Sequence, residues 1–162
     1  VHAKDELGRT PLHAAAASCT SPEHTNILKL LVSNGAAVDE PDNMGRTPLF
    51  WAISGSGMLD AVKLLLVQGA DPCAKDKGGC QPMHFAAHFS RKECILVLAE
   101  NDASIECVDN RGRTPLHAAA ASDEMVEKII ASTSNPLHCD KDGRTALHLA
   151  VMGDHTDSFI TM

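Results

Sequence analysis

The sequence predicts an all-α protein, a solenoid of stacked helix pairs, and three observations predict it. A short phrase, Thr-Pro-Leu-His-Ala-Ala in its fullest form, starts five times, at residues 10, 47, 81, 114 and 145. The starts are spaced at the period of a helix-pair repeat. After each of the first four copies, aliphatic residues follow the i, i+3, i+4 spacing of a helix with one buried face. With 44% hydrophobic residues among 162, the chain can fill a continuous core.

A five-residue turn opens each repeat, with Asp at its first place and Gly at its fourth. Glycine supplies a positive φ, and the Asp side chain can bond the backbone two residues further on. We expect these turns to form hairpin-like fingers. The fingers are residues 5–9, 42–46, 76–80, 109–113 and 140–144.

Two helices are expected after each finger. The first begins with Thr at the N-cap and Pro at the first helical position, where its missing N–H costs nothing. The second carries the aliphatic stripe, and Gly35 and Gly69 are expected to end it in the left-handed conformation. Asp102 and Thr133 occupy that place in repeats three and four, so those helix ends should be less regular.

The phrase, the finger glycines and the aliphatic stripes recur in phase over essentially the whole chain, and together they resemble the ankyrin repeat. The resemblance implies a curved stack of antiparallel helix pairs, whose fingers and first helices form a concave face that binds other proteins. It divides a single domain, 1–162, into five repeats. These are approximately 5–41, 42–75, 76–108, 109–139 and a partial 140–162.

Several places depart from the family pattern. Residues 19–24 are an insertion between the helices of repeat one, repeat four is short in the same region, and Phe50 replaces the usual His. The family often has Asn just before a finger and can be regulated by its hydroxylation, but no target matches here. That place holds His2, Asp39, Cys73, Glu106 and Leu137.

Both ends of the chain lie within a repeat. Residues 1–5 match the tail of a preceding repeat, and residues 157–162 look like the beginning of a second helix. Terminal repeats normally carry polar capping faces, and none is evident. We therefore expect a fragment of a longer array; the alternative is a short array with frayed ends.

The charge, the apolar runs and the cysteine content limit which partners and which cellular compartment the sequence suits. The net charge of −7 and pI near 5.6 argue against a nucleic-acid surface and disfavour an anionic membrane. The longest purely apolar helical run, 95–99, is too short to insert in a bilayer. Six scattered cysteines without a Cys-x-x-Cys pair indicate free thiols and a reducing compartment, cytoplasmic or nuclear.

Recurring His and Cys residues admit both a structural and a chemical interpretation. At least one repeat separates any two of His13, His84, His117 and His148, too far for common zinc ligands, so each imidazole is expected to bond its capping Thr and nearby backbone. For a set of four cysteines a metal or redox cluster is conceivable, but we favour a structural role as small, buried side chains that fill the core. That set is Cys73, Cys80, Cys107 and Cys139.

No catalytic template matches the sequence. The Ser/Gly run at 54–57 is a turn between helices and lacks the strand before a nucleophile elbow. Gly78 and Gly79 complete a finger rather than a phosphate-binding loop. We therefore predict a protein that is not an enzyme and needs no cofactor.

The candidate binding residues lie on the fingers and at the end of a first helix. One cation follows the finger Gly in four repeats, and other cations lie near it; Arg suits bidentate contacts with carboxylates. The structural alternative is that these arginines pair with the turn aspartates. The cationic set is Arg9, Arg46, Arg113 and Arg144, with Lys77, Arg111 and Lys141.

Four more residues face the groove in the family to which the sequence is similar: Leu7, Met44, His88 and Phe89. An exposed Phe89 beside Met44 would add an apolar element to the cationic row. Trp51, also on a first helix, is expected to pack between Ala14 and Phe85 rather than to stand free.

These observations predict a non-catalytic protein-interaction module, monomeric in isolation. Its concave surface, centred on repeats two to four, would bind a protein partner, with an acidic or carboxylate-bearing segment as a specific hypothesis. A rigid array loses little entropy on binding, so modest contacts suffice. The alternative is a cytosolic regulatory segment of a larger channel or signalling enzyme, packed on its own parent chain.

Overall fold

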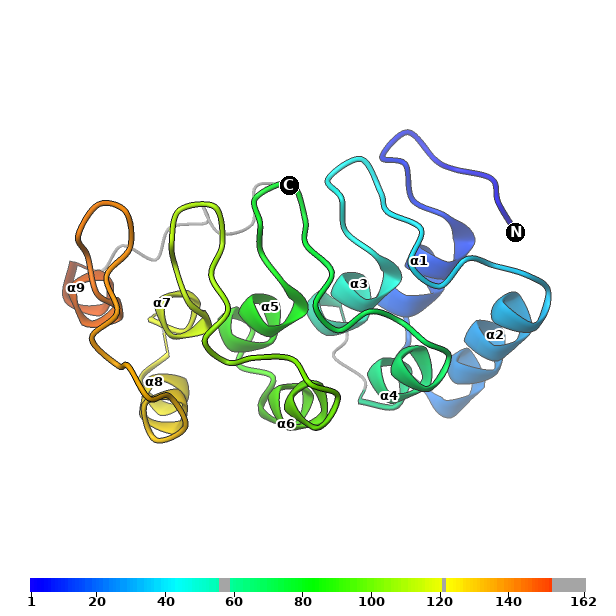
Figure 1. The fold of residues 1–162 in the computed structure, drawn as a ribbon. Helices are drawn as coiled ribbons and strands as arrows, with labels where there is room; N and C mark the ends of the chain where they lie inside the picture. Colours follow the sequence, from blue (N-terminus) through cyan, green and yellow to red (C-terminus); the bar gives the residue numbers. More distant parts are fainter. Residues whose placement is uncertain (56–58, 121, 153–162) are drawn as a thin grey trace.

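The chain forms two parallel rows of helices in the computed structural model, which describes residues 1–55, 59–120 and 122–152 (Figure 1). Within these ranges all regular elements are helices, so the predicted all-α solenoid is confirmed. The helices are α1 (Pro11–Ala17), α2 (Pro22–Ser33), α3 (Pro48–Ser54), α4 (Leu59–Val67), α5 (Pro82–His88), α6 (Lys92–Glu100), α7 (Pro115–Ala118), α8 (Asp123–Ile130) and α9 (Ala146–Met152).

Odd-numbered helices form the row next to the fingers, and even-numbered helices form the outer row (Figure 1). The insertion in repeat one allows α2 to reach 12 residues, whereas α4 and α6 have 9 each. Repeat four is reduced in both rows, because α7 has 4 residues and α8 has 8. The second helix expected at 157–162 lies outside the described residues.

Each finger is closed by the carboxylate at its first place. That Asp accepts the backbone N–H of the third and fifth finger residues, at 2.7–3.0 Å in all five fingers. The fourth-place Gly has a φ between 75° and 79° in every finger, as predicted, and its N–H donates to the Asp carbonyl. The sequence pattern therefore fixes the finger backbone locally.

Neighbouring fingers are joined by backbone hydrogen bonds. The second residue of a finger donates its N–H to the third-residue carbonyl of the finger before it, at 2.8–2.9 Å, in all four seams. The side-chain amides of Asn43 and Asn110 add bonds to the carbonyls of Glu6 and Lys77. We call this continuous set of bonds the finger ladder; it fixes the spacing of the finger tips.

The recurring histidines connect each first helix to the next finger. Nδ1 of His13 accepts from the Thr10 N–H at 3.0 Å, so Nε2 carries the proton and donates to the Arg46 carbonyl at 3.0 Å. His84 and His117 repeat both bonds two and three repeats further along. The structural interpretation of these imidazoles is confirmed.

Repeat two has Phe50 where repeats one, three and four have His, so the hydrogen bond to the next finger is absent there. The Phe50 ring is fully buried and meets Phe85 edge-on, with centroids 4.9 Å apart. The hydroxyl of Thr47, which a His would have engaged, is buried without a hydrogen-bond partner among the described residues. Between repeats two and three, aromatic packing therefore replaces the hydrogen bond that a histidine would form.

The ends of the second helices follow the glycine prediction. Gly35 and Gly69 have φ values of 83° and 88°. Asp102 takes the same left-handed conformation, with φ 65°, which costs more energy for Asp than for Gly. At Thr133 no such value occurs, and α8 instead ends at a right-handed Ala131. The two irregular ends therefore differ from each other.

Candidate protein-binding surface

The third residue of each finger is the most variable part of an otherwise uniform turn. These residues are Leu7, Met44, Gly78, Arg111 and Asp142. The Leu7 side chain is 54% exposed, Arg111 is exposed, and Met44 is half-buried. Lys77 and Lys141, at the second finger place, are also exposed. The finger ladder thus holds a fixed row of tips whose side chains differ.

Two of the four finger arginines lie inside this row rather than on it. Arg46 and Arg113 are each 7% exposed. Nε of Arg46 lies 3.5 Å from the Asp76 carboxylate of the next finger, and Arg113 binds the Asp109 carboxylate through Nε and Nη2 at 2.8 Å. These contacts correspond to the framework interpretation, pairing with turn aspartates, and they leave little guanidinium surface for a partner.

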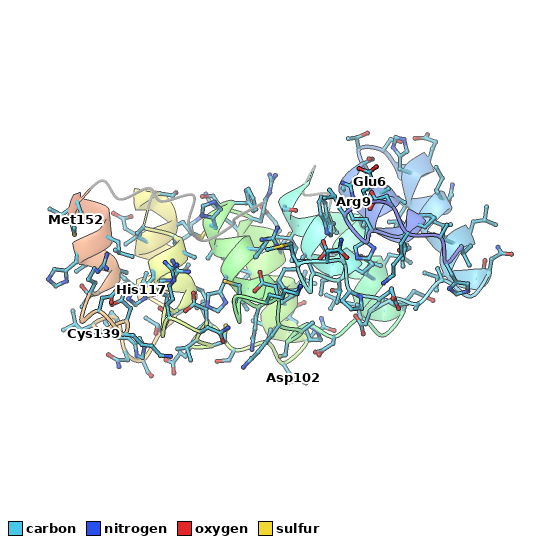
Figure 2. The ribbon with its side chains drawn as sticks, turned by 90° about the horizontal axis from the view of Figure 1, so that it is seen from above. Glu6, Arg9, Asp102, His117, Cys139 and Met152 are labelled. Carbon is cyan, nitrogen blue, oxygen red and sulfur yellow. The ribbon has the colours of Figure 1, made fainter. Side chains whose placement is uncertain are left out.

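The other two arginines are half-buried and also paired. Arg9 lies 2.7 Å from the Asp5 carboxylate, and its hydrogen bond holds the pKa of Asp5 below its usual value. Arg144 lies 2.6 Å from Asp142. Figure 2 shows Arg9 beside Glu6 near one end of the row, with Cys139 and Met152 toward the other. Of the four finger arginines, two are therefore buried in the framework and two are partly accessible.

Trp51 forms a cross-repeat contact that sequence reasoning missed. Its indole N–H donates to Asp42 at 2.9 Å, and the guanidinium carbon of Arg9 lies 5.1 Å from the ring centroid. Arg46 lies over the Phe85 ring at the same 5.1 Å, one repeat further on. The sequence signal for both contacts is a shared spacing: an Arg at the fifth place of one finger is followed by an aromatic residue on the first helix of the next repeat.

Trp51 is only half-buried, although it packs against the core as expected. A cation over a ring face contributes about 0.5–1 kcal/mol at a partly exposed site. Because Arg9 covers this ring, the pair forms a joint apolar and cationic surface between the first finger and α3.

Phe89 is less exposed than predicted. It follows the last residue of α5, is half-buried against the core, and lies 6.2 Å from the Phe85 ring. His88 meets it edge-on at 4.9 Å. The structure brings Phe89 together with Phe85 and His88, so one part of the ring packs inward and the remainder faces out.

The cysteines are free and mostly packed. Cys19, Cys80 and Cys94 are buried, Cys73 and Cys107 are half-buried, and only Cys139 is exposed, against the filler interpretation at that one place. Burial raises the pKa of Cys80 to about 12 and that of Cys94 to about 11. A thiol so rarely ionised is a poor nucleophile.

No cluster of His, Cys, Asp or Glu capable of holding a metal ion occurs among the residues that the structure describes. Cys80 stands where the other fingers have Arg, and its Sγ lies 3.9 Å from the Asp109 carboxylate. The residue that interrupts the arginine row thus still faces the next turn aspartate. Across the described ranges, no helix has the length and apolar content needed to cross a membrane.

Comparison with known proteins gives one consistent result. The family model described as ankyrin repeats (3 copies) matches residues 1–76, 54–137 and 83–161. A protein of Danio rerio that is named as the palmitoyltransferase ZDHHC13 is 31% identical over 163 residues, covering 98% of this chain and 24% of that protein. The human B-cell lymphoma 3 protein is 30% identical over 154 residues, covering 91% of this chain and 34% of that protein.

A third relative is a channel subunit. The human transient receptor potential cation channel subfamily A member 1 is 30% identical over 197 residues, covering 95% of this chain and 17% of that protein. The chain thus spans between 17% and 34% of the length of these relatives. Repeats of this kind are protein-interaction modules and are generally non-catalytic. The matched model, the relatives and the helix-pair architecture together show that the chain belongs to the ankyrin repeat family.

Proposed function

We propose that this chain is a non-catalytic interaction module that binds a protein partner along its fingers and first helices. One observation carries the proposal: the finger ladder holds every tip backbone in the same way, while the tip side chains differ. A surface with a fixed backbone and variable side chains loses little conformational entropy on binding. Such a surface suits recognition better than it suits core packing.

The accessible charges on this surface favour a partner segment that carries carboxylates. Lys77, Arg111 and Lys141 are exposed on three consecutive fingers, within a chain whose net charge is −7. A local cationic row on an acidic protein gives both orientation and selectivity, because like-charged partners are repelled elsewhere. Arg9 with Trp51, and His88 with Phe89, supply the apolar contacts at the first helices.

A peptide-display selection on the isolated chain tests this proposal. We expect the selected peptides to be rich in Asp and Glu, and to lose about tenfold or more in affinity for a Lys77→Glu, Arg111→Glu double variant. The matched control reverses Lys29 and Lys63, which are exposed on the outer helices. The proposal fails if the control variant loses as much affinity as the finger variant.

The second candidate is a regulatory segment that packs on its own parent chain. The limited coverage of ZDHHC13 and of the channel subunit favours it, because in both proteins the matching region is a minor part of a longer polypeptide. Lysine cross-linking of the full polypeptide distinguishes the candidates. Links from Lys77 and Lys141 to the same chain support self-packing, whereas links to a second protein support the module.

A further inference from the structure

The backbone bonds of the finger ladder place two cations side by side between fingers four and five. The Lys141 N–H donates to the Arg111 carbonyl at 2.9 Å, and backbone segments joined in this way lie about 5 Å apart. A methyl group added at Gly112 would lie 3.4 Å from Cγ of Lys141, so the lysine stem extends over the finger that carries Arg111. Both side chains are exposed, and their fingers stand next to each other at one end of the row (Figure 1).

Of the four contacts between neighbouring fingers, one joins two like charges. At each contact the third residue of one finger meets the second residue of the next finger. The pairs are Leu7 with Asn43, Met44 with Lys77, Gly78 with Asn110, and Arg111 with Lys141. Like charges on neighbouring backbone segments repel each other and lower stability. Packing of the free protein therefore does not explain why Arg111 and Lys141 are paired.

The carboxylates of these two fingers are engaged elsewhere. Asp109 and Asp140 accept the backbone N–H groups that close their own fingers. Asp142 pairs with the Arg144 guanidinium at 2.6 Å. Over the described ranges, neither cation of the pair forms an ion pair with a carboxylate. The two positive charges therefore remain available to a binding partner.

We propose that Arg111 and Lys141 together bind a phosphorylated side chain on a partner peptide. A phosphorylated serine carries close to two negative charges near pH 7 and three acceptor oxygens, which matches two adjacent cations. The planar guanidinium of Arg111 can donate two parallel hydrogen bonds to a phosphate, and the Lys141 ammonium adds a compact charge beside it. A single carboxylate would leave one of the two charges unmatched.

The surroundings of the pair favour a single phosphate over an extended polyanion. Nucleic acids and anionic membranes need many cations on one face, whereas this chain has a net charge of −7 and Asp142 is exposed beside the pair. Lys77, the remaining cation among the paired tip residues, lies beside Met44 and has no charged residue opposite it. This inference rests on the proposed function, because it specifies which anion the finger surface recognises.

Protein-detected NMR titration tests the inference, with the capped pentapeptide Ala-Ala-phosphoserine-Ala-Ala as the probe. We expect amide shifts at Arg111, Gly112 and Lys141. Two matched peptides carry Ser or Glu in place of phosphoserine, and each should bind about tenfold or more weakly. Inorganic phosphate is the third probe. If it bound as tightly as the phosphopeptide, the assignment to a peptide would be overturned in favour of a site for the free ion.

Two substitutions copy residues that other fingers carry at the same places, so both variants should fold. Arg111→Met copies the third residue of finger two, and Lys141→Asn copies the second residue of the same finger. Each should weaken binding of the phosphopeptide about tenfold, because one of the two cations is lost. The matched control, Lys77→Asn, makes the same exchange on finger three and should leave the affinity unchanged.

The outcomes separate this inference from the proposed function. If the phosphoserine and Glu peptides bind equally, or if Lys77→Asn weakens the phosphopeptide as much as Lys141→Asn does, the paired-cation site is wrong. The proposed function still stands in that case, provided that the acidic peptides selected by display bind the fingers. If neither the phosphopeptide nor the selected peptides bind there, both are wrong.

Discussion

At the scale of single residues, burial disfavours protonation of the histidines that link a first helix to the next finger. Burial lowers the pKa of His13, His84 and His117 below the ordinary value. Their Nε2–H bonds to backbone carbonyls need only the neutral ring, so the folded protein gains nothing by protonating Nδ1, which already accepts a hydrogen bond. These side chains therefore couple folding to pH.

The sign of that coupling follows from which state binds the proton. Below about pH 6.5 the unfolded histidines take up protons that the folded ones exclude, so the free energy of unfolding falls as pH falls. Each histidine contributes at most about 1.4 kcal/mol per pH unit in this window. Urea unfolding between about pH 7.5 and 5.5 measures the effect above the range in which ordinary carboxylates titrate.

One variant measures how much His117 contributes to the pH dependence of the unfolding free energy. His117→Phe copies the substitution that the chain itself carries at Phe50, so the helix should still form. We expect a smaller pH dependence than in the unmodified protein, because one proton-excluding group has been removed. An unchanged slope would mean that His117 does not contribute to the coupling.

Trp51 offers a second measurement at this scale, because it is the single tryptophan of the chain. Arg9 covers its ring, and the indole N–H is bonded to Asp42. In Arg9→Ala we expect acrylamide to quench the fluorescence more strongly, since the ring face becomes open to solvent. Arg144→Ala, which removes a cation from the far end of the row, should leave quenching as it was.

At the scale of the element, the finger depends on a glycine for two separable reasons. Gly79 and Gly143 have φ values of 78° and 75°, so an alanine is strained at both. At Gly79 an added Cβ would also lie 2.7 Å from the Asn110 backbone nitrogen of the next finger, whereas at Gly143 nothing lies within 4 Å. The two positions therefore separate conformational strain from crowding between fingers.

Alanine substitution at each position measures these contributions. Gly143→Ala should cost about 1–2 kcal/mol of unfolding free energy, from the left-handed backbone alone. Gly79→Ala should cost a further 1–3 kcal/mol or so, because the neighbouring finger has to move. Equal losses in urea unfolding would show that contact between fingers adds nothing to the requirement for glycine.

Sequence periodicity predicted the elements well because their determinants are local. The N-cap residue, the first helical residue and the His or Phe lie within four residues of one another at each first helix, and the finger Asp and Gly lie within a single turn. The positions of Arg46 and Arg113 were harder to predict, because the depth of a side chain depends on how the next repeat stacks over it. The Arg9–Trp51 pair, likewise, joins two repeats whose relative position no local pattern specifies.

The exposure of Phe89 was overestimated for a related reason. The residue follows the end of α5, where the chain could turn outward, but Phe85 on the preceding helical turn offers it an aromatic surface.

At the scale of the whole molecule, stability should decline from the middle of the array toward the fourth repeat. Leu49, Phe50, Ile53 and Met83 on α3 and α5 are 0% exposed, whereas α7 has only 4 residues, and Val151 on α9 is 88% exposed. In repeat proteins each unit is stabilised mainly by its neighbours, so the least packed units open first.

Hydrogen exchange read by mass spectrometry checks this gradient. We expect the slowest amide exchange in α3 and α5 and the fastest, among the described helices, in α8 and α9. Uniform protection from α1 to α9 would contradict the gradient and indicate a single cooperative unit.

The finger ladder also has a mechanical consequence. It makes one edge of the molecule behave as a strip that cannot stretch, since each pair of tips is held at one hydrogen-bond length. Among the described residues, no backbone–backbone hydrogen bond joins one outer helix to the next; the outer row is held by packing and by side-chain bonds such as those that Glu106 accepts from Thr133 and Ser134. When the array flexes, its hinge line must therefore run along the fingers. A load applied there would therefore change the spacing of the outer helices before it changed the spacing of the finger tips.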